Sequence, residues 1–125
     1  SIIAAVKEAG INRLLVVGGA GSLEVAPGKK FMDAPQFPQE YRTEAAAMGE
    51  VLDMLRKEPA LDWTFLSPPA LFSPGKRTGR YREGGDQLLS DAAGNSRISM
   101  EDYATALLDE VETPRHSRRR YTVAY

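Results

Sequence analysis

The small residues that follow an apolar run are the first candidates for chemistry in this sequence. The run Arg13–Val17 (RLLVV) has the continuous apolar character of a buried strand. Directly after it come Gly18, Gly19, Ala20 and Gly21. Glycine lets a ligand come close to the backbone, and ligands of open α/β sheets bind just beyond the carboxyl ends of strands. The pattern predicts a loop that lines a ligand cleft, with a tight turn that binds nothing as the alternative.

Two well-known phosphate-binding loops do not fit this segment. Glu24 stands where the third glycine of a pyrophosphate fingerprint belongs, and no helix pattern begins there. No Gly-Lys-Ser/Thr sequence follows, which excludes a P-loop. The loop is therefore not expected to bind a pyrophosphate.

Helix and strand patterns alternate around this loop. Ile2–Gly10 reads as a helix that ends at its glycine, Thr43–Lys57 as a second helix with Thr43 as N-cap, and Asp62–Leu66 as a second strand. The apolar side of the second helix consists of Ala47, Val51, Leu52, Met54 and Leu55. Helix followed by strand, twice, predicts parallel strand pairing in an α/β fold.

The segments between and after these elements are predicted from their turn residues. Ser22–Gln39 is rich in proline and glycine and reads as an irregular loop. Short strand candidates separated by glycine turns predict a small surface hairpin; they are Tyr81-Arg82, Gln87–Leu89 and Arg97-Ile98. Ser99, with Asp102 three residues on, is the expected N-cap of a third helix, and Arg120–Tyr125 is the expected terminal strand.

Composition excludes several kinds of site and partner. The 125 residues include no cysteine, which excludes disulfides, thiolate metal sites and cysteine nucleophiles. A formal net charge of −1 gives no overall attraction to nucleic acid or to an anionic membrane, and no apolar run approaches the roughly 20 residues of a membrane span. We expect a single domain in the cytoplasm. Because the chain starts at Ser1, we also expect processing, a removed tag or a fragment.

The order of these segments resembles a known family. RLLVVGGAG, LDWTFLSPPALFSPG and ISMEDYATALLDE together are similar to the C-terminal half of atypical short-chain dehydrogenase/reductases, in the NADH-flavin reductase-like group related to NmrA. The resemblance covers essentially the whole chain. It implies the C-terminal part of a doubly wound, Rossmann-type parallel sheet with a small β-hairpin on the substrate side. The N-terminal, pyrophosphate-binding half would then be absent from residues 1–125.

The same resemblance implies a cofactor and a set of site residues. The cofactor would be NAD(P)H, with FMN or FAD as a possible substrate. Its nicotinamide side would contact Gly18, Gly19, Ala20, Gly21, Ser67, Pro68, Pro69 and Ala70. A planar substrate would contact Ser22, Leu71, Phe72 and Tyr81, although the aromatic residues of a small hairpin more often form its own core.

Tyr41 is the one weak candidate for a catalytic group. Classical short-chain dehydrogenases use a tyrosine as general acid, with a lysine four positions on that lowers its pKa. Here that position is Ala45, and neither lysine nor arginine occurs between Arg42 and Arg56. Carbonyl reduction is therefore disfavoured, whereas hydride transfer to a flavin or quinone depends more on stacking and alignment.

Other polar and aromatic residues are given structural roles. His116 is the only histidine and has no metal-ligand partner at useful spacing, so no metal site is predicted. Arg115 and Arg118–Arg120 read as a solvated connection before the last strand, with phosphate contact as the alternative. Trp63 is expected in the core.

Three functional hypotheses remain open at this point. The first is an NAD(P)H-dependent reductase of flavins or quinones. The second is a non-catalytic, NmrA-like protein that senses dinucleotide. The third is an inactive fragment whose open sheet edge associates with its N-terminal half or with a second copy.

Overall fold

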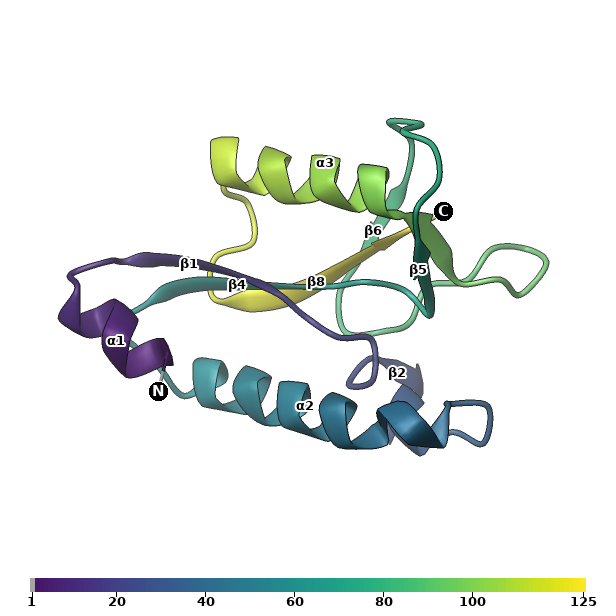
Figure 1. Cartoon of the computed structure of the whole chain (residues 1–125), viewed down its shortest axis with the longest axis horizontal. Coiled ribbons are helices and arrows are strands. Elements are labelled where there is room, and N and C mark those ends of the chain that lie inside the picture. The colour runs from purple at the N-terminus through teal and green to yellow at the C-terminus, as the bar shows by residue number, and fades with distance from the viewer. Residues whose placement is uncertain (1) are drawn as a thin grey trace.

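The computed structural model describes residues 2–125, and its centre is a mainly parallel sheet (Figure 1). Within these residues the main sheet has the strand order β1 (Arg13–Val17), β4 (Asp62–Ser67), β8 (Arg119–Ala124), β6 (Arg82–Gly84). The first three strands pair in parallel, and β6 is antiparallel to β8. The predicted α/β class and parallel pairing are confirmed.

Helices cover both faces of this sheet. The helices are α1 (Ile2–Glu8), α2 (Arg42–Arg56) and α3 (Met100–Glu112). Figure 1 shows α2 and α3 on opposite sides of the sheet. Trp63 and Phe65 of β4 pack with Leu52 and Leu55 of α2, whereas Leu66 packs on the α3 side. Because β4 is buried on both faces, its continuous apolar run is explained and Trp63 is confirmed as a core residue.

The helix ends follow the predicted signals in two cases of three. Gly10 follows α1 with φ of +73°, a conformation that favours glycine. Ser99 Oγ accepts a hydrogen bond of 3.0 Å from the backbone N–H of Asp102, as the N-cap of α3. The prediction for Thr43 is wrong, because α2 begins at Arg42 and its N-cap, Tyr41, makes no side-chain capping bond. A preceding 3₁₀ turn, Gln39–Tyr41, leads directly into the helix.

The buried side of α2 consists partly of other residues than the sequence predicts. Leu52 and Leu55 are buried and Val51 is half-buried, but Ala47 and Met54 are exposed. Ala45 and Gly49 occupy the buried side instead. The small side chain of Ala45 lets the helix lie close to Gly21 in the loop that follows β1.

The predicted hairpin within residues 81–98 is wrong. β6 pairs with the terminal strand β8, and β7 (Arg97–Ser99) pairs in parallel with β5 (Leu71–Ser73). Gln87 forms only an isolated bridge to Glu24. The paired strands are far apart in the sequence. A local hairpin would have left β5 and the outer edge of β8 unpaired, and the observed pairings cover both.

The segment 22–39 is more regular than its breakers suggest. It contains an antiparallel pair of short strands, β2 (Glu24–Ala26) and β3 (Lys29–Lys30), followed by a 3₁₀ turn at Phe31–Asp33. Gly28 takes φ of +74° in the connecting turn. Pro27 and Gly28 therefore form the turn of a hairpin, whereas residues 34–38, which include Pro35 and Pro38, are irregular as predicted.

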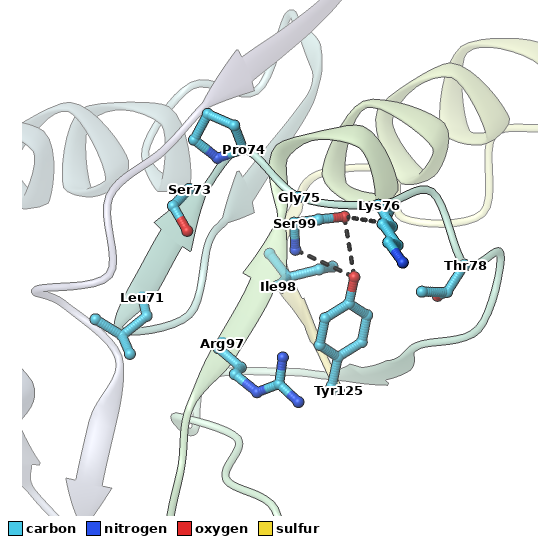
Figure 2. A pocket seen from close by; sticks show the side chains of 10 residues that line it. All are labelled: Leu71, Ser73, Pro74, Gly75, Lys76, Thr78, Arg97, Ile98, Ser99 and Tyr125. Atoms are coloured by element: carbon cyan, nitrogen blue, oxygen red, sulfur yellow. Dashed lines mark hydrogen bonds between the residues drawn. The ribbon is translucent and has the colours of Figure 1, made fainter.

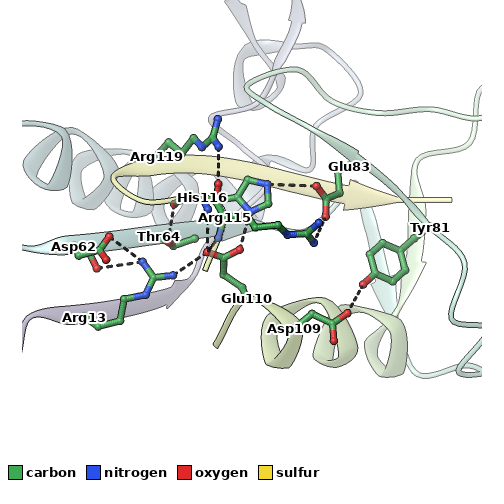
Figure 3. Close-up of polar contacts among 10 residues, drawn as sticks. All are labelled: Arg13, Asp62, Thr64, Tyr81, Glu83, Asp109, Glu110, Arg115, His116 and Arg119. Carbon is green, nitrogen blue, oxygen red and sulfur yellow. Dashed lines mark hydrogen bonds and ion pairs between the residues drawn. The ribbon is translucent and has the colours of Figure 1, made fainter. Parts of the chain in front are cut away.

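A charged network connects the elements at the amino end of the parallel strands (Figure 3). Arg13 of β1 pairs with Asp62 of β4 at 3.1 Å and with Glu110 of α3 at 2.8 Å. His116 Nδ1 lies 2.7 Å from Glu110 Oε1, and its ring stacks on Tyr121 with centroids 3.7 Å apart. His116 thus has a structural role at the end of the sheet away from the glycine loop.

One edge of the sheet is apolar and partly open. β1 is the edge strand, and Val17 is 54% exposed. A cavity of about 440 Å³ beside it is lined by apolar residues of α1, β1 and α2. The expected association with another polypeptide stays a prediction. Among residues 2–125, no helix is long and apolar enough to cross a membrane.

Candidate functional site

The loop after β1 forms one wall of a cleft at the carboxyl ends of β1 and β4. The cavity there measures about 450 Å³. Its loop wall consists of Gly18, Gly19, Ala20 and Gly21. Tyr41, Glu44, Ala45 and Met48, at the start of α2, form a second wall, and Ala70 and Leu71 close a third side. Parallel strands place these loops at one edge of the sheet, which is where open α/β sheets bind ligands.

Two of the loop glycines are required by packing within the protein. A Cβ at Gly18 would lie 2.2 Å from Cε1 of Phe65, and a Cβ at Gly21 would lie 2.5 Å from Cβ of Ala45. A Cβ at Gly19 would make only an ordinary contact, 3.7 Å from Met48. The identities of Gly18 and Gly21 therefore say nothing about a ligand. Gly19 is the position at which the cleft can be tested without disturbing the fold.

The end of β4 is fixed to this loop by hydrogen bonds. The carbonyl oxygen of Leu66 accepts from the backbone N–H of Gly18 at 2.8 Å and from the hydroxyl of Tyr103 at 2.7 Å. Burial raises the pKa of Tyr103. This tyrosine therefore stays protonated and acts as a structural donor.

Tyr41 lies in the cleft wall but lacks the arrangement of a tuned general acid. Its side chain is 55% exposed. Ala45, four positions on, lies against Gly21 and carries no cation, so the lysine that would tune Tyr41 is absent. Among the described residues that line this cleft, Glu44 alone carries a charge at neutral pH.

The structure brings together only part of the predicted site. Ala70 and Leu71 line the cleft, whereas Ser67, Pro68 and Pro69 are buried and do not line it. The two aromatic candidates lie elsewhere. Phe72 packs on Tyr103 with ring centroids 4.7 Å apart, and the hydroxyl of Tyr81 lies 3.4 Å from Asp109.

Ser22 and Ser67 meet at a buried arginine that the sequence analysis placed in solvent. Arg120 is 5% exposed, so the prediction of a solvated connection is wrong for this residue. Its Nη1 donates to Ser22 Oγ at 2.9 Å and to Ser67 Oγ at 3.3 Å, and its Nε donates to Asp86 at 2.9 Å. Burial lowers the pKa of Arg120 and the Asp86 carboxylate raises it, but a guanidinium stays protonated at neutral pH. Arg120 thus connects the loop after β1 to the end of β4.

The sequence itself contained an indication that Arg120 is buried. Arg120 belongs to an alternating strand, in phase with Thr122, and both residues are buried. A strand inside a parallel sheet is covered on both faces, so an arginine within it needs buried partners.

A second cavity adjoins the cleft. It measures about 510 Å³ and shares Phe31, Pro38, Ala70 and Leu71 with the first cavity. The β2–β3 hairpin contributes Val25, and the segment before β7 contributes Asn95 and Ser96. The two cavities therefore share a wall, which allows two bound groups to lie next to each other.

A third cavity, of about 360 Å³, lies between β5, β7 and Tyr125 (Figure 2). Asp102 is fully buried and bonded to two residues of this lining: it accepts hydrogen bonds from the hydroxyls of Tyr125 and Thr78 and from the backbone of Thr78 and Gly79. Burial raises the pKa of Asp102, but these donors outweigh it and lower the value to about 2. The carboxylate is thus a fixed anion that orders the segment beside α3.

The residues of the cleft fit a nicotinamide ring better than a pyrophosphate. Its surface is largely apolar, with the backbone of Gly19 and Ala20 accessible to a flat ring. Within residues 2–125, no cation lines the cleft, and the short strand β2 follows the loop in place of a helix. No group of three or more His, Asp or Glu side chains in these residues could hold a metal ion.

Comparisons with known proteins agree with this description. YwnB of Bacillus subtilis, a protein of uncharacterized function, is 50% identical over 126 residues, which cover 98% of this chain and 59% of that protein. A "putative epimerase" of Bacteroides thetaiotaomicron superposes with a TM-score of 0.95 at 51% identity, covering 99% of this chain and 58% of the other. A "putative NADH-flavin reductase" of Streptococcus pneumoniae gives a TM-score of 0.82 at 41% identity, covering 90% and 55%.

The chain is shorter than these relatives, of which it spans 55% to 59%. Residues 1–114 match the model of a family described as NAD(P)H-binding. The match includes the glycine loop, the whole of α2 and β4, and the expected resemblance to NADH-flavin reductases is confirmed. The chain therefore belongs to the NAD(P)H-binding family.

Proposed function

We propose that this chain forms the nicotinamide side of an NAD(P)H-dependent reductase whose acceptor is a planar molecule such as a flavin or a quinone. The observation that carries the proposal is the apolar cleft at the carboxyl ends of β1 and β4, next to a second cavity with a shared wall. Such a pair of cavities suits a cofactor ring beside an acceptor ring. When bound, a reduced nicotinamide supplies hydride.

The residues of this chain would bind and orient that ring. Gly19 and Ala20 present accessible backbone, while Met48, Phe37 and Pro38 provide apolar surface that excludes water from one side of the cleft. Arg120 keeps the loop in place through Ser22 without lining the cleft itself. Binding and alignment are thus the main contributions of the chain to the reaction.

The proton chemistry of the cleft favours a flavin or quinone over a carbonyl acceptor. A reduced carbonyl needs a proton from a positioned acid, and the lysine that would tune Tyr41 is replaced by the buried Ala45. Reduced flavins and quinones can take their proton from water. The name of the Streptococcus protein points to the same reaction, which supports the proposal for this chain.

The test is turnover by the protein at its full natural length. NADH or NADPH is mixed with riboflavin or menadione, and oxidation of the nicotinamide is followed by absorbance. We expect acceptor-dependent oxidation with at least one of the two cofactors. Saturable binding of dinucleotide without oxidation of any acceptor would support the alternative, a dinucleotide sensor, and would contradict the reductase.

A matched pair of glycine variants shows whether turnover takes place in the cleft. Gly19→Val adds a side chain inside the cleft, where its Cβ meets only Met48 at 3.7 Å. Gly85→Val makes the same change at a turn where nothing lies within 4 Å of the new Cβ. Turnover should fall only in the first variant.

A further inference from the structure

The second cavity has an uncharged lining. Its apolar surface comes from Val25, Phe31, Pro38 and Leu88, in addition to Ala70 and Leu71. Its polar side chains are Gln36, Asn95, Ser90 and Ser96. None of the lining residues, all within the described part of the chain, carries a charge. A ligand here is therefore recognised by shape, apolar contact and neutral hydrogen bonds.

Two amides in this lining are available to a ligand. Within residues 2–125, the side chains of Gln36 and Asn95 make no hydrogen bond, whereas Ser96 Oγ already accepts from the backbone of Ala70 at 3.1 Å. An amide donates and accepts. Such a pair matches a ring that carries both carbonyl oxygens and N–H groups, or carbonyl oxygens alone.

Arg82 is bonded to a residue of this cavity's lining, but through backbone carbonyls. Its Nη2 donates to the carbonyls of Ser90 and Tyr125 at 2.7 Å each. Among the described residues, neither this guanidinium nor another cation lines the cavity. A phosphate held in the cavity would thus lack the charged partner that phosphate recognition normally uses.

We propose that this second cavity is the acceptor subsite and that it binds a neutral planar ring, the isoalloxazine of a flavin or a quinone, without recognising a phosphate. The inference rests on the proposed function and deepens it by naming the acceptor's chemical class and place. In the reaction, the nicotinamide is oxidised and its hydride reduces the acceptor, which also takes one proton from water. NAD(P)H, acceptor and H⁺ thus give NAD(P)⁺ and the dihydro acceptor.

The shared wall is what makes this geometry suited to the reaction. Ala70 and Leu71 line both cavities, as do Phe31 and Pro38. Phe31 is fixed by an edge-to-face contact with Phe37, with ring centroids 5.0 Å apart. A ring in the second cavity therefore lies against the same side chains as a ring in the cleft.

The first experiment compares acceptors that differ only in a phosphate. The KM of riboflavin, FMN and the neutral quinone menadione is measured with the full-length protein at saturating NAD(P)H. We expect the KM values of riboflavin and FMN to agree within about threefold, because a charged hydrogen bond to the phosphate would alone be worth about tenfold or more. A preference of tenfold or more for FMN would overturn the inference while leaving the reductase proposal intact. Absence of turnover with every acceptor would instead overturn the reductase proposal.

The second experiment locates the subsite with two exposed valines. Val25 lines the second cavity and is 37% exposed, whereas Val111 lies on α3 and is 57% exposed. Val25→Ala should raise the acceptor KM about two- to tenfold through lost apolar contact and leave the KM of NAD(P)H unchanged. Val111→Ala is the control and should change neither value. Equal acceptor KM values in the two variants would place the acceptor elsewhere.

A third experiment adds a positive charge to the lining of the second cavity. Ser90→Lys adds a cation to the lining, and Ala92→Lys adds one at an exposed position outside it. Ser90→Lys should shift the preference toward FMN over riboflavin by at least about threefold. The same shift in both variants would show a general charge effect and would contradict the subsite.

Discussion

Nη1 of Arg120 donates a hydrogen bond of 2.9 Å to Oγ of Ser22, across 98 positions of sequence. Nη2 of the same guanidinium reaches the carbonyl of Ser22 at 3.2 Å. The last strand of the sheet thereby fixes the loop that follows the first. The cleft depends on this contact although Arg120 does not line it.

Removal of this arginine should loosen the loop and destabilise the fold. Arg120→Met keeps much of the side-chain volume but leaves Ser22 and Ser67 without this donor, and Asp86 keeps only its pairing with Arg56. Since hydrogen bonds to charged groups contribute about 1.5–3 kcal/mol each and are not additive, we expect the free energy of unfolding to fall by about 2–4 kcal/mol. Urea denaturation measures this free energy of unfolding. Arg119→Met, at an exposed neighbour, is the control; equal losses would show that the buried contacts contribute little.

Asp102 should make the stability of the protein depend on pH in the acid range. Its pKa is lowered from 3.8 to about 2, so its stabilising effect is fully present above the unfolded value. The effect is lost as the pH falls from about 4 to about 2. Asp102→Asn should therefore be less stable than the wild type at neutral pH, and the difference should shrink through this window. Thermal unfolding at several pH values measures it; a constant difference would contradict the assigned role.

Glu110 should affect stability without affecting the cleft. Burial raises its pKa, but hydrogen bonds from His116 and from the backbone of Arg115 and His116 lower it overall. Glu110 also pairs with Arg13 at 2.8 Å. Because removing one partner of a buried pair costs about 3–5 kcal/mol, Glu110→Ala should lower the midpoint of urea unfolding. The dissociation constant of dinucleotide, measured well below that midpoint, should stay as in the wild type; a large change would place this network in the binding site.

Gly18 should be intolerant of any side chain for a reason unrelated to ligands. A Cβ there would lie 2.2 Å from the ring of Phe65. We expect Gly18→Ala to cost about 1–3 kcal/mol of stability through overpacking. The double variant Gly18→Ala/Phe65→Leu should recover part of the stability that the two single changes lose separately. Strict additivity in a double-mutant cycle would contradict the packing explanation.

The elements defined by short-range patterns were predictable from the sequence. β4 follows from its apolar run, and the start of α3 follows from Ser99 and Asp102, which lie three residues apart. Parallel pairing followed from the order of helices and strands. In these cases the residues that determine the structure are neighbours in the chain.

The features that sequence reasoning missed depend on distant partners. β6 pairs with β8, about 40 residues later, so the glycine turns between residues 84 and 95 suggested a hairpin that does not form. The partners of Arg120 lie 34, 53 and 98 positions away. Ser67, Pro68 and Pro69 were placed beside the cofactor, but only the structure shows that they are buried outside the cleft lining and that Ala70 and Leu71 line it.

The most direct test of the central claim is the affinity of the full-length protein for NADH and NADPH, compared between Gly19→Val and Gly85→Val. The account predicts that the first change weakens binding by about tenfold or more, because a valine side chain occupies space in the cleft, where Gly19 tolerates a Cβ. The second change should leave affinity unchanged. Equal affinity in the two variants, with both folded, would contradict the assignment of this cleft to the nicotinamide.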